Sequence, residues 1–229
     1  PKNARVSFWF TGENRRPPPS FQGWDLSLSF DADSWPRNVY LPLWLLSTDA
    51  FGPSSGGLLG EELSLQALSS GRPDVDFERR PKFACAFLRN PEPTRLSAIA
   101  ALEQIGRVDV FGPYSNRPVR TKADVAHEYR FMLCFENDLY PGYVTEKPVE
   151  AWAAGCVPLW WGLDRERTLY EHSLVNLAEA ESLESFVDQV AALDGDIAQL
   201  ETTWRAPLLT NGSYAALAKA RNWHHCNRC

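Results

Sequence analysis

The feature that most constrains the fold is a strand–loop–helix–strand pattern between residues 131 and 161. Two short apolar runs, 131–135 and 157–161, have the length and composition of buried strands. Thr145 is a candidate N-cap for the helix between them, and Gly155 is a candidate C-cap. Pro148 falls in the first turn of that helix, where proline is tolerated. Two strands joined through a helix in this way predict a parallel sheet.

The same plan occurs earlier in the chain. Residues 83–88 predict a strand, Thr94 is a candidate cap for a helix that ends near Gly106, and residues 108–111 predict the next strand. Repeated β–α alternation predicts an α/β fold with right-handed crossovers, and therefore a Rossmann-like C-terminal half. Outside these units the patterns predict a strand over 5–10 and helical segments near 63–68, 182–193 and 200–220.

The region between residues 54 and 81 is rich in Ser, Gly, Pro and Arg, which is typical of an interdomain boundary. We therefore predict a partial N-terminal domain over residues 1–78 and a C-terminal domain over residues 79–229.

Composition excludes some classes of protein. The net charge of −6 argues against a nucleic-acid partner held by bulk electrostatics. The sequence contains neither a run of ~20 apolar residues nor a signal peptide. Because it begins at Pro1, we expect a fragment or a processed product, and an upstream anchor would lie outside it.

Polar side chains crowd the loop that follows the 131–135 run. Asn137, Tyr143, Glu146 and Lys147 all lie in it or at its end. Loops at the carboxyl ends of parallel strands form the ligand sites of open α/β sheets, and helix N-termini bind anions. This pattern predicts a diphosphate-type ligand, although a polar surface loop is the alternative.

Arg95 and Lys147 occupy corresponding places, each in the first turn of its predicted helix. Both helices should begin at the same sheet edge, so two cations and two helix dipoles could converge on one anion. A cation at a helix N-terminus opposes the dipole, and an anionic ligand would offset that penalty. For either residue alone, the alternative is a solvated surface charge.

Three motifs resemble those of the α-1,3-fucosyltransferases of glycosyltransferase family 10. Residues 135–162, FENDLYPGYVTEKPVEAWAAGCVPLWWG, resemble the donor-site signature of that family. Residues 10–14, FTGEN, resemble its Y-T-G-E-N segment, and residues 90–95 resemble its S-N-x-x-x-x-R loop. The motifs fall in the family's order, and the resemblance extends over nearly the whole chain.

The resemblance implies a GT-B fold, with a Rossmann-like donor-binding domain and an incomplete Rossmann-like acceptor domain. It implies inverting transfer of fucose from GDP-fucose to O3 of an N-acetylglucosamine-containing glycan. Glu13 matches the general base, and Arg95 and Lys147 match the residues that hold the diphosphate. Asn137, Tyr143 and Glu146 match other donor contacts, with Glu146 on a ribose hydroxyl. No metal is required, although manganese could stimulate the reaction. The family has substantial sequence before the T-G-E-N strand that this chain lacks, so we expect the chain alone to transfer fucose poorly or not at all.

The compartment and the cysteines leave alternatives open. The Cys226–Cys229 pair and the Asn211 sequon favour the Golgi lumen and a type II protein anchored upstream, with a bacterial cytoplasmic enzyme as the alternative. Disulfides are favoured over zinc for Cys226 and Cys229, because no second pair has zinc spacing. The remaining cysteines, Cys85, Cys134 and Cys156, are expected to be buried thiols.

Two other functions compete with this interpretation. A metal-dependent glycosyltransferase would use an Asp-x-Asp pair, but the three candidate pairs lie in irregular stretches that predict loop acids: Asp31/Asp33, Asp74/Asp76 and Asp194/Asp196. A non-catalytic nucleotide-sugar or glycan-binding relative would keep only the donor loop.

Overall fold

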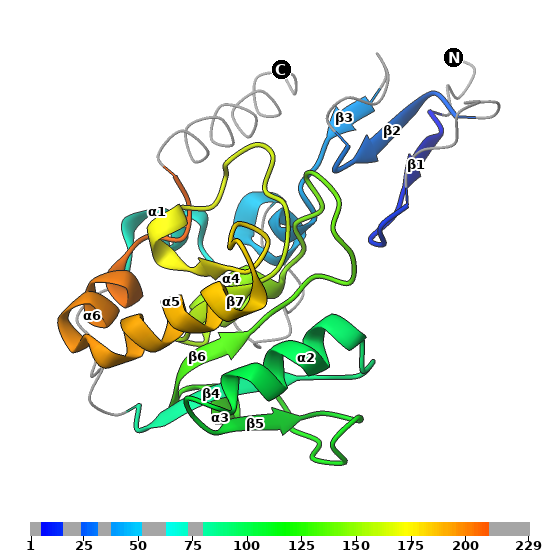
Figure 1. The fold of residues 1–229 in the computed structure, drawn as a ribbon. Helices are drawn as coiled ribbons and strands as arrows, with labels where there is room; N and C mark the ends of the chain where they lie inside the picture. Colours follow the sequence, from blue (N-terminus) through cyan, green and yellow to red (C-terminus); the bar gives the residue numbers. More distant parts are fainter. Residues whose placement is uncertain (1–5, 16–23, 32–37, 52–62, 73–79, 211–229) are drawn as a thin grey trace.

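The computed structural model describes residues 6–15, 24–31, 38–51, 63–72 and 80–210, which form two parallel sheets of different size (Figure 1). The strands are β1 (Phe8–Phe10), β2 (Leu26–Ser29), β3 (Asn38–Tyr40), β4 (Lys82–Phe87), β5 (Val108–Phe111), β6 (Tyr129–Leu133), β7 (Val157–Trp160) and β8 (Val175–Asn176). The α-helices are α1 (Leu65–Ser70), α2 (Pro93–Leu102), α3 (Ala123–Ala126), α4 (Lys147–Ala153), α5 (Leu183–Gly195) and α6 (Ile197–Arg205). Short 3-10 helices are η1 (Leu43–Ser47), η2 (Asp49–Phe51) and η4 (Glu171–Ser173).

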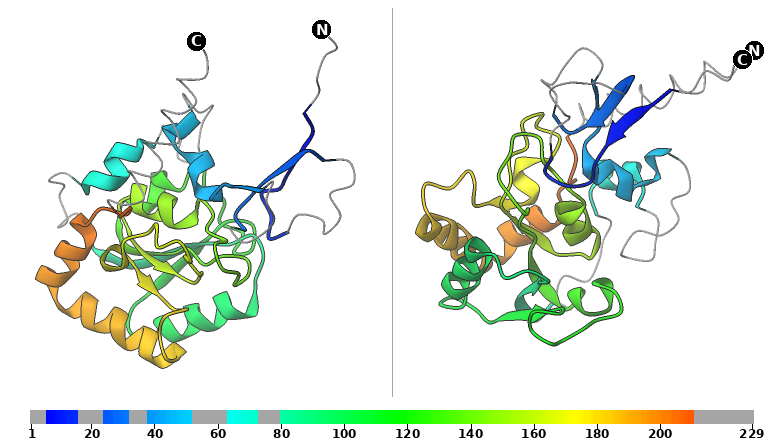
Figure 2. Two further views of the ribbon diagram at one scale, coloured as in Figure 1. Left: turned by 90° about the horizontal axis from the view of Figure 1, so that it is seen from above. Right: turned by 90° about the vertical axis from the view of Figure 1, so that its right-hand side faces the viewer.

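The larger sheet has the strand order β5-β4-β6-β7-β8, and every pairing in it is parallel. Helices α2 and α5 lie on one side of this sheet, and α3 and α4 lie on the other (Figure 2, right). Each side has its own apolar core, which is the layered arrangement expected when both faces of a parallel sheet are buried.

The order of the larger sheet creates a crevice between β4 and β6. The chain leaves β4 toward β5 on one side and then returns to β6 on the other side of β4. The helices that follow β4 and β6, α2 and α4, therefore lie on opposite faces of the sheet. Open α/β sheets bind ligands at such a switch point, outside the carboxyl ends of the strands.

The smaller sheet, β1-β2-β3, exposes a row of apolar side chains to solvent along the segment that contains β1. Val6 is 64% exposed, Phe8 53% and Phe10 42%. Parallel sheets are normally covered on both faces, so the described residues do not supply a complete core for this sheet. Its end is joined to the larger body through a small buried cluster of Phe30, Leu43 and Tyr143.

Most predicted elements are confirmed, with corrections at their ends. Helix α2 begins at Pro93 with Glu92 as N-cap, not at Thr94, and α4 has Glu146 rather than Thr145 as N-cap. The predicted 200–220 helix is wrong over 206–210: α6 ends at Arg205 because Pro207 follows, and residues 211–220 lie outside the described part. Strand β8 was not predicted, since it contains only two residues.

The α/β class with parallel sheets is confirmed. The boundary predicted near residue 78 stays a prediction, because residues 52–62 and 73–79 lie outside the described residues. No helix in the described ranges has the length and apolar character needed to span a membrane.

Candidate anion-binding site

A cavity of about 220 Å³ lies at the crevice between β4 and β6. We call it the switch-point cavity. Its polar lining includes Arg89, Asn90, Arg95, Lys122, Asn137, Glu146 and Lys147. Arg95 and Lys147 therefore face the same cavity, as the predicted convergence of the two helix N-termini requires.

Arg95 is held by several hydrogen bonds, although no carboxylate lies within hydrogen-bonding distance of it among the described residues. Its Nη2 donates to the carbonyl oxygens of Phe135 and Glu136, at 3.1 and 3.0 Å, and to Asn137 Oδ1 at 2.7 Å. The residue is only 8% exposed. Burial lowers the pKa of the Arg95 guanidinium, and the carboxylates of Glu92 and Glu136 oppose that shift. Arg95 thus brings a positive charge that no directly bonded acid neutralises.

Lys147 is oriented by a buried acid that the sequence analysis did not single out. Lys147 Nζ donates to Glu136 Oε2 at 2.9 Å and to Thr145 Oγ1 at 3.1 Å. Glu136 also accepts from the Thr145 backbone N–H at 2.9 Å, the Thr145 hydroxyl at 2.7 Å and Trp160 Nε1 at 3.3 Å. Glu136 is 1% exposed, and these donors satisfy both of its oxygens. Glu136 directly follows the apolar run 131–135 in the sequence, and this position could have identified it as a buried acid.

Asn137 and Glu146 complete the lining that comes from the β6–α4 loop, residues 134–146. The Asn137 side chain is exposed and accepts the hydrogen bond from Arg95, which leaves its amide N–H groups directed away from that contact. Glu146 is half-buried at the N-cap of α4. A carboxylate at this edge of a cationic cavity is suited to accept hydrogen bonds from ligand hydroxyls.

Tyr143 lies beside the cavity rather than among its lining residues. It is 1% exposed and packs edge-to-face on Phe30, with ring centroids 5.1 Å apart. Burial raises the pKa of the Tyr143 phenol, and the charges of Glu136, Glu13 and Glu146 raise it further. The structure makes Tyr143 the link between the smaller sheet and the β6–α4 loop.

Glu13 lies in an exposed turn after β1, outside the cavity lining. Its backbone N–H donates to Thr11 Oγ1 at 3.1 Å. The neighbouring Asn14 donates through Nδ2 to Asp138 Oδ2 at 2.6 Å, which ties this turn to the β6–α4 loop. The first and last of the three sequence motifs are thus in direct contact.

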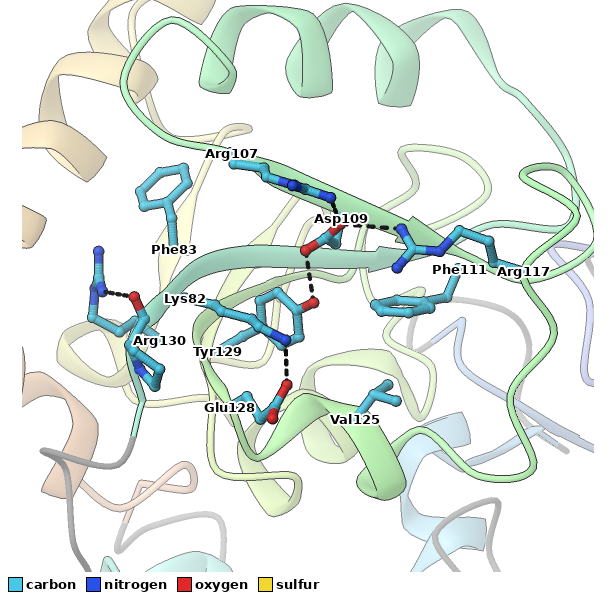
Figure 3. Close-up of a pocket in the computed structure, with 11 residues that line it drawn as sticks. Lys82, Phe83, Arg107, Asp109, Phe111, Arg117, Val125, Glu128, Tyr129 and Arg130 are labelled. Carbon is cyan, nitrogen blue, oxygen red and sulfur yellow. Dashed lines mark hydrogen bonds and ion pairs between the residues drawn. The ribbon is translucent and has the colours of Figure 1, made fainter.

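A larger cavity, about 690 Å³, lies elsewhere (Figure 3). Its lining comes mainly from the beginnings of β4, β5 and β6, at the edge of the sheet opposite the switch-point cavity. The charges there are already paired: Asp109 accepts from Arg107, Arg117 and Tyr129, and Lys82 pairs with Glu128. The place of the switch-point cavity, at the carboxyl ends of the strands, favours it as the ligand site.

Other candidates from the sequence have structural roles or lie outside the described residues. Asp194 pairs with Arg130, and Asp196 caps α6 through the Gln199 N–H. Asp33, Asp74, Asp76, Asn211, Cys226 and Cys229 lie outside the described residues. Cys85, Cys134 and Cys156 are buried free thiols, as expected.

Comparison with known proteins identifies the family of this chain. Residues 77–229 match the family described as glycosyltransferase family 10 (fucosyltransferase), C-terminal part. The chain belongs to this fucosyltransferase family. The matched segment contains Arg95 and Lys147 and the whole β6–α4 loop.

Individual family 10 relatives extend the likeness into the N-terminal part. The α-(1,3)-fucosyltransferase FucT of Helicobacter pylori is 27% identical over 218 residues, which are 84% of this chain and 45% of that protein. A human 3-galactosyl-N-acetylglucosaminide 4-α-L-fucosyltransferase is 26% identical over 214 residues, covering 86% of this chain and 52% of that protein. The chain therefore spans about half the length of these relatives.

A crystal structure of an α1,3-fucosyltransferase with GDP-fucose superposes with a TM-score of 0.67 at 22% identity, covering 96% of this chain and 75% of that one. This likeness confirms the fold class expected from the family resemblance, the GT-B type.

Proposed function

We propose that this family 10 chain binds GDP-fucose and takes part in transferring fucose to a hydroxyl of a glycan. The observation that most supports the proposal is the placement of Arg95 and Lys147 on one cavity at the switch point of the sheet. Two fixed cations and a helix N-terminus suit the diphosphate of a sugar nucleotide. Relatives whose names include fucosyltransferase, and a solved structure with GDP-fucose, support the same donor.

In the proposed reaction the bond between fucose C1 and the β-phosphate oxygen breaks, and its electron pair stays on the leaving GDP. Arg95 and Lys147 stabilise the negative charge that develops on that diphosphate. The acceptor hydroxyl attacks C1 from the opposite face, so the anomeric configuration is inverted. The Glu13 carboxylate takes the hydroxyl proton as general base. Its exposed position, in a turn bonded to the β6–α4 loop, suits a group that must meet an incoming acceptor.

The remaining assignments are part of the same proposal. Asn137 and Tyr143 contact the donor, and Glu146 accepts from a ribose hydroxyl. The acceptor is an N-acetylglucosamine-containing glycan that reacts at O3. The reaction needs no metal, although manganese could stimulate it. The Golgi lumen is the proposed compartment, and the bacterial cytoplasm is the alternative, since relatives come from both a human and a bacterium.

Calorimetric titration with GDP, GMP and guanosine tests the donor site. The expected order of affinity is GDP, then GMP, then guanosine, because each phosphate adds charge-assisted hydrogen bonds. Arg95→Lys should weaken GDP binding about tenfold or more, since an ammonium has no second nitrogen to bond a phosphate oxygen while the first bonds the β6–α4 loop. Arg107→Lys, in the other cavity, is the matched control and should leave the affinity unchanged. Equal affinities for GDP and guanosine in the unmodified protein would refute the proposal.

Glu13→Gln separates an enzyme from a non-catalytic binding relative. The variant should keep its affinity for GDP-fucose and lose transfer to an N-acetylglucosamine-containing acceptor. Binding of GDP-fucose without transfer in the unmodified protein joined to the acceptor-side sequence of a family member would favour the binding relative. Loss of transfer in EDTA with rescue by manganese would favour the metal-dependent alternative.

A further inference from the structure

Lys122 is a further cation on the switch-point cavity, beside Arg89, Arg95 and Lys147. It precedes α3, between β5 and β6, and lines the cavity together with Arg95 and Lys147. Its side chain is 24% exposed, so it is partly sheltered yet open to the cavity. None of the three sequence motifs contains it.

Lys122 is held from behind by a buried acid. Its Nζ forms an ion pair with Glu150 Oε2, and the Glu150 side chain is 3% exposed. Burial raises the pKa of Glu150, and the nearby Lys122 opposes that shift. The arrangement matches that of Lys147, whose ammonium group is held by the fully buried Glu136 carboxylate. The cavity thus has two lysines, each supported by its own buried glutamate.

The Lys122 ammonium group retains donors for a ligand. It has three N–H groups, and within the described part of the chain Glu150 is its one hydrogen-bond acceptor. The Phe87 ring lies 5.9 Å from Nζ and adds a weak cation–π contact. Lys122 and Lys147 both act electrostatically on Cys134 and on Glu150, which agrees with their lying on the same cavity.

A purely structural ion pair is the competing explanation. Burying a carboxylate costs more than burying an apolar side chain of the same size, so such a pair is a poor way to stabilise a fold. That cost is easier to explain if Glu150 serves to hold Lys122 in position on the cavity wall.

We propose that Lys122, positioned by Glu150, is a third phosphate-binding cation of the switch-point cavity. It would contact the diphosphate of the nucleotide together with Arg95 and Lys147. This inference rests on the proposed nucleotide-sugar function and adds a residue to it. A diphosphate has several oxygens, so three cations from three segments of the chain can each bond a different one.

Calorimetric titration with inorganic pyrophosphate, GDP and guanosine tests the proposal on the whole chain. Lys122→Gln should weaken pyrophosphate and GDP binding about tenfold or more and leave guanosine binding unchanged. Lys122→Arg should retain most of the affinity. Lys82→Gln is the matched control, because Lys82 also pairs with a glutamate but lies in the other cavity. It should bind all three ligands as the unmodified protein does.

A double variant keeps the test decisive if Lys122→Gln fails to fold. If Lys122→Gln unfolds because Glu150 is left unpaired, Lys122→Gln with Glu150→Gln removes both charges and should recover the melting temperature while pyrophosphate binding stays weak. Recovery of full affinity in that double variant would overturn the inference, since Lys122 would then serve only to neutralise Glu150. Unchanged pyrophosphate affinity in a folded Lys122→Gln variant would also overturn it. Failure of the unmodified protein to bind pyrophosphate or GDP would refute the proposed function itself.

Discussion

The fully buried carboxylate of Glu136 accepts a hydrogen bond from the Lys147 ammonium group at 2.9 Å. The same carboxylate is bonded by Thr145 and Trp160, so its position is set by the backbone of the β6–α4 loop and by β7. Glu136 therefore joins the loop, the first residue of α4 and the sheet into one polar network. We expect it to position Lys147 rather than to touch a ligand.

Glu136→Gln should lower both stability and phosphate affinity. The amide keeps the shape of the side chain but leaves the partly buried Lys147 without its counter-charge, at a cost of about 1–3 kcal/mol in the free energy of unfolding. Urea denaturation and GDP titration measure the two effects. Glu128→Gln, which breaks an exposed pair, is the control and should change stability much less. Equal effects of the two substitutions would contradict a positioning role for Glu136.

The hydrogen bond between Asn14 and Asp138 should couple the turn that contains Glu13 to the β6–α4 loop. In the chain joined to the acceptor-side sequence of a family member, Asn14→Ala and Asp138→Ala should each slow the proposed fucose transfer. GDP affinity should stay nearly unchanged, because neither residue lines the cavity. In a double-mutant cycle on kcat/KM, the coupling should be about 0.5–1.5 kcal/mol. Strict additivity of the two substitutions would show that the bond does not position Glu13.

Gly142 should not tolerate a side chain. Its φ is +85°, and a Cβ there would lie 2.7 Å from the Phe30 carbonyl oxygen. Gly142→Ala should therefore destabilise the protein by about 1–3 kcal/mol and loosen the contact between β2 and the β6–α4 loop. Thermal unfolding measures the change. Gly195→Ala is the control: a Cβ there would meet open space and no positive φ forbids it, so the substitution should not destabilise the protein.

Asp109 should make stability depend on pH in the acid range. Burial would raise its pKa, but hydrogen bonds from Tyr129, Arg117 and Arg107 outweigh burial and lower it. A carboxyl whose pKa is lowered by folding stabilises the protein above its unfolded pKa, about 4, and loses that contribution as pH falls through the folded value. Asp109→Asn should thus destabilise the protein at pH 7, and the difference should shrink below about pH 4. Urea midpoints at pH 7, 5 and 3.5 test this, and a constant difference would contradict it.

The sequence alone was enough to predict the parallel sheet, the family and the convergence of Arg95 and Lys147. Each of these follows from local patterns, since short apolar strands alternating with capped helices leave few topologies, and parallel strands bring their following loops to one edge. The helix caps were less predictable: Glu92 and Glu146 begin α2 and α4 without capping side chains, so tertiary packing rather than Thr94 and Thr145 sets their first residues.

Only the tertiary structure decided which acids point inward. Glu136 and Glu146 are both loop glutamates in the sequence, yet one is buried beneath Lys147 and the other lines the cavity. Lys122 lines the cavity because the strand order brings the segment before α3 to the ends of β4 and β6, although none of the three motifs contains it. Burial of a charge depends on partners supplied by several elements at once, and a linear pattern records only the side chains, not the packing that brings those partners together.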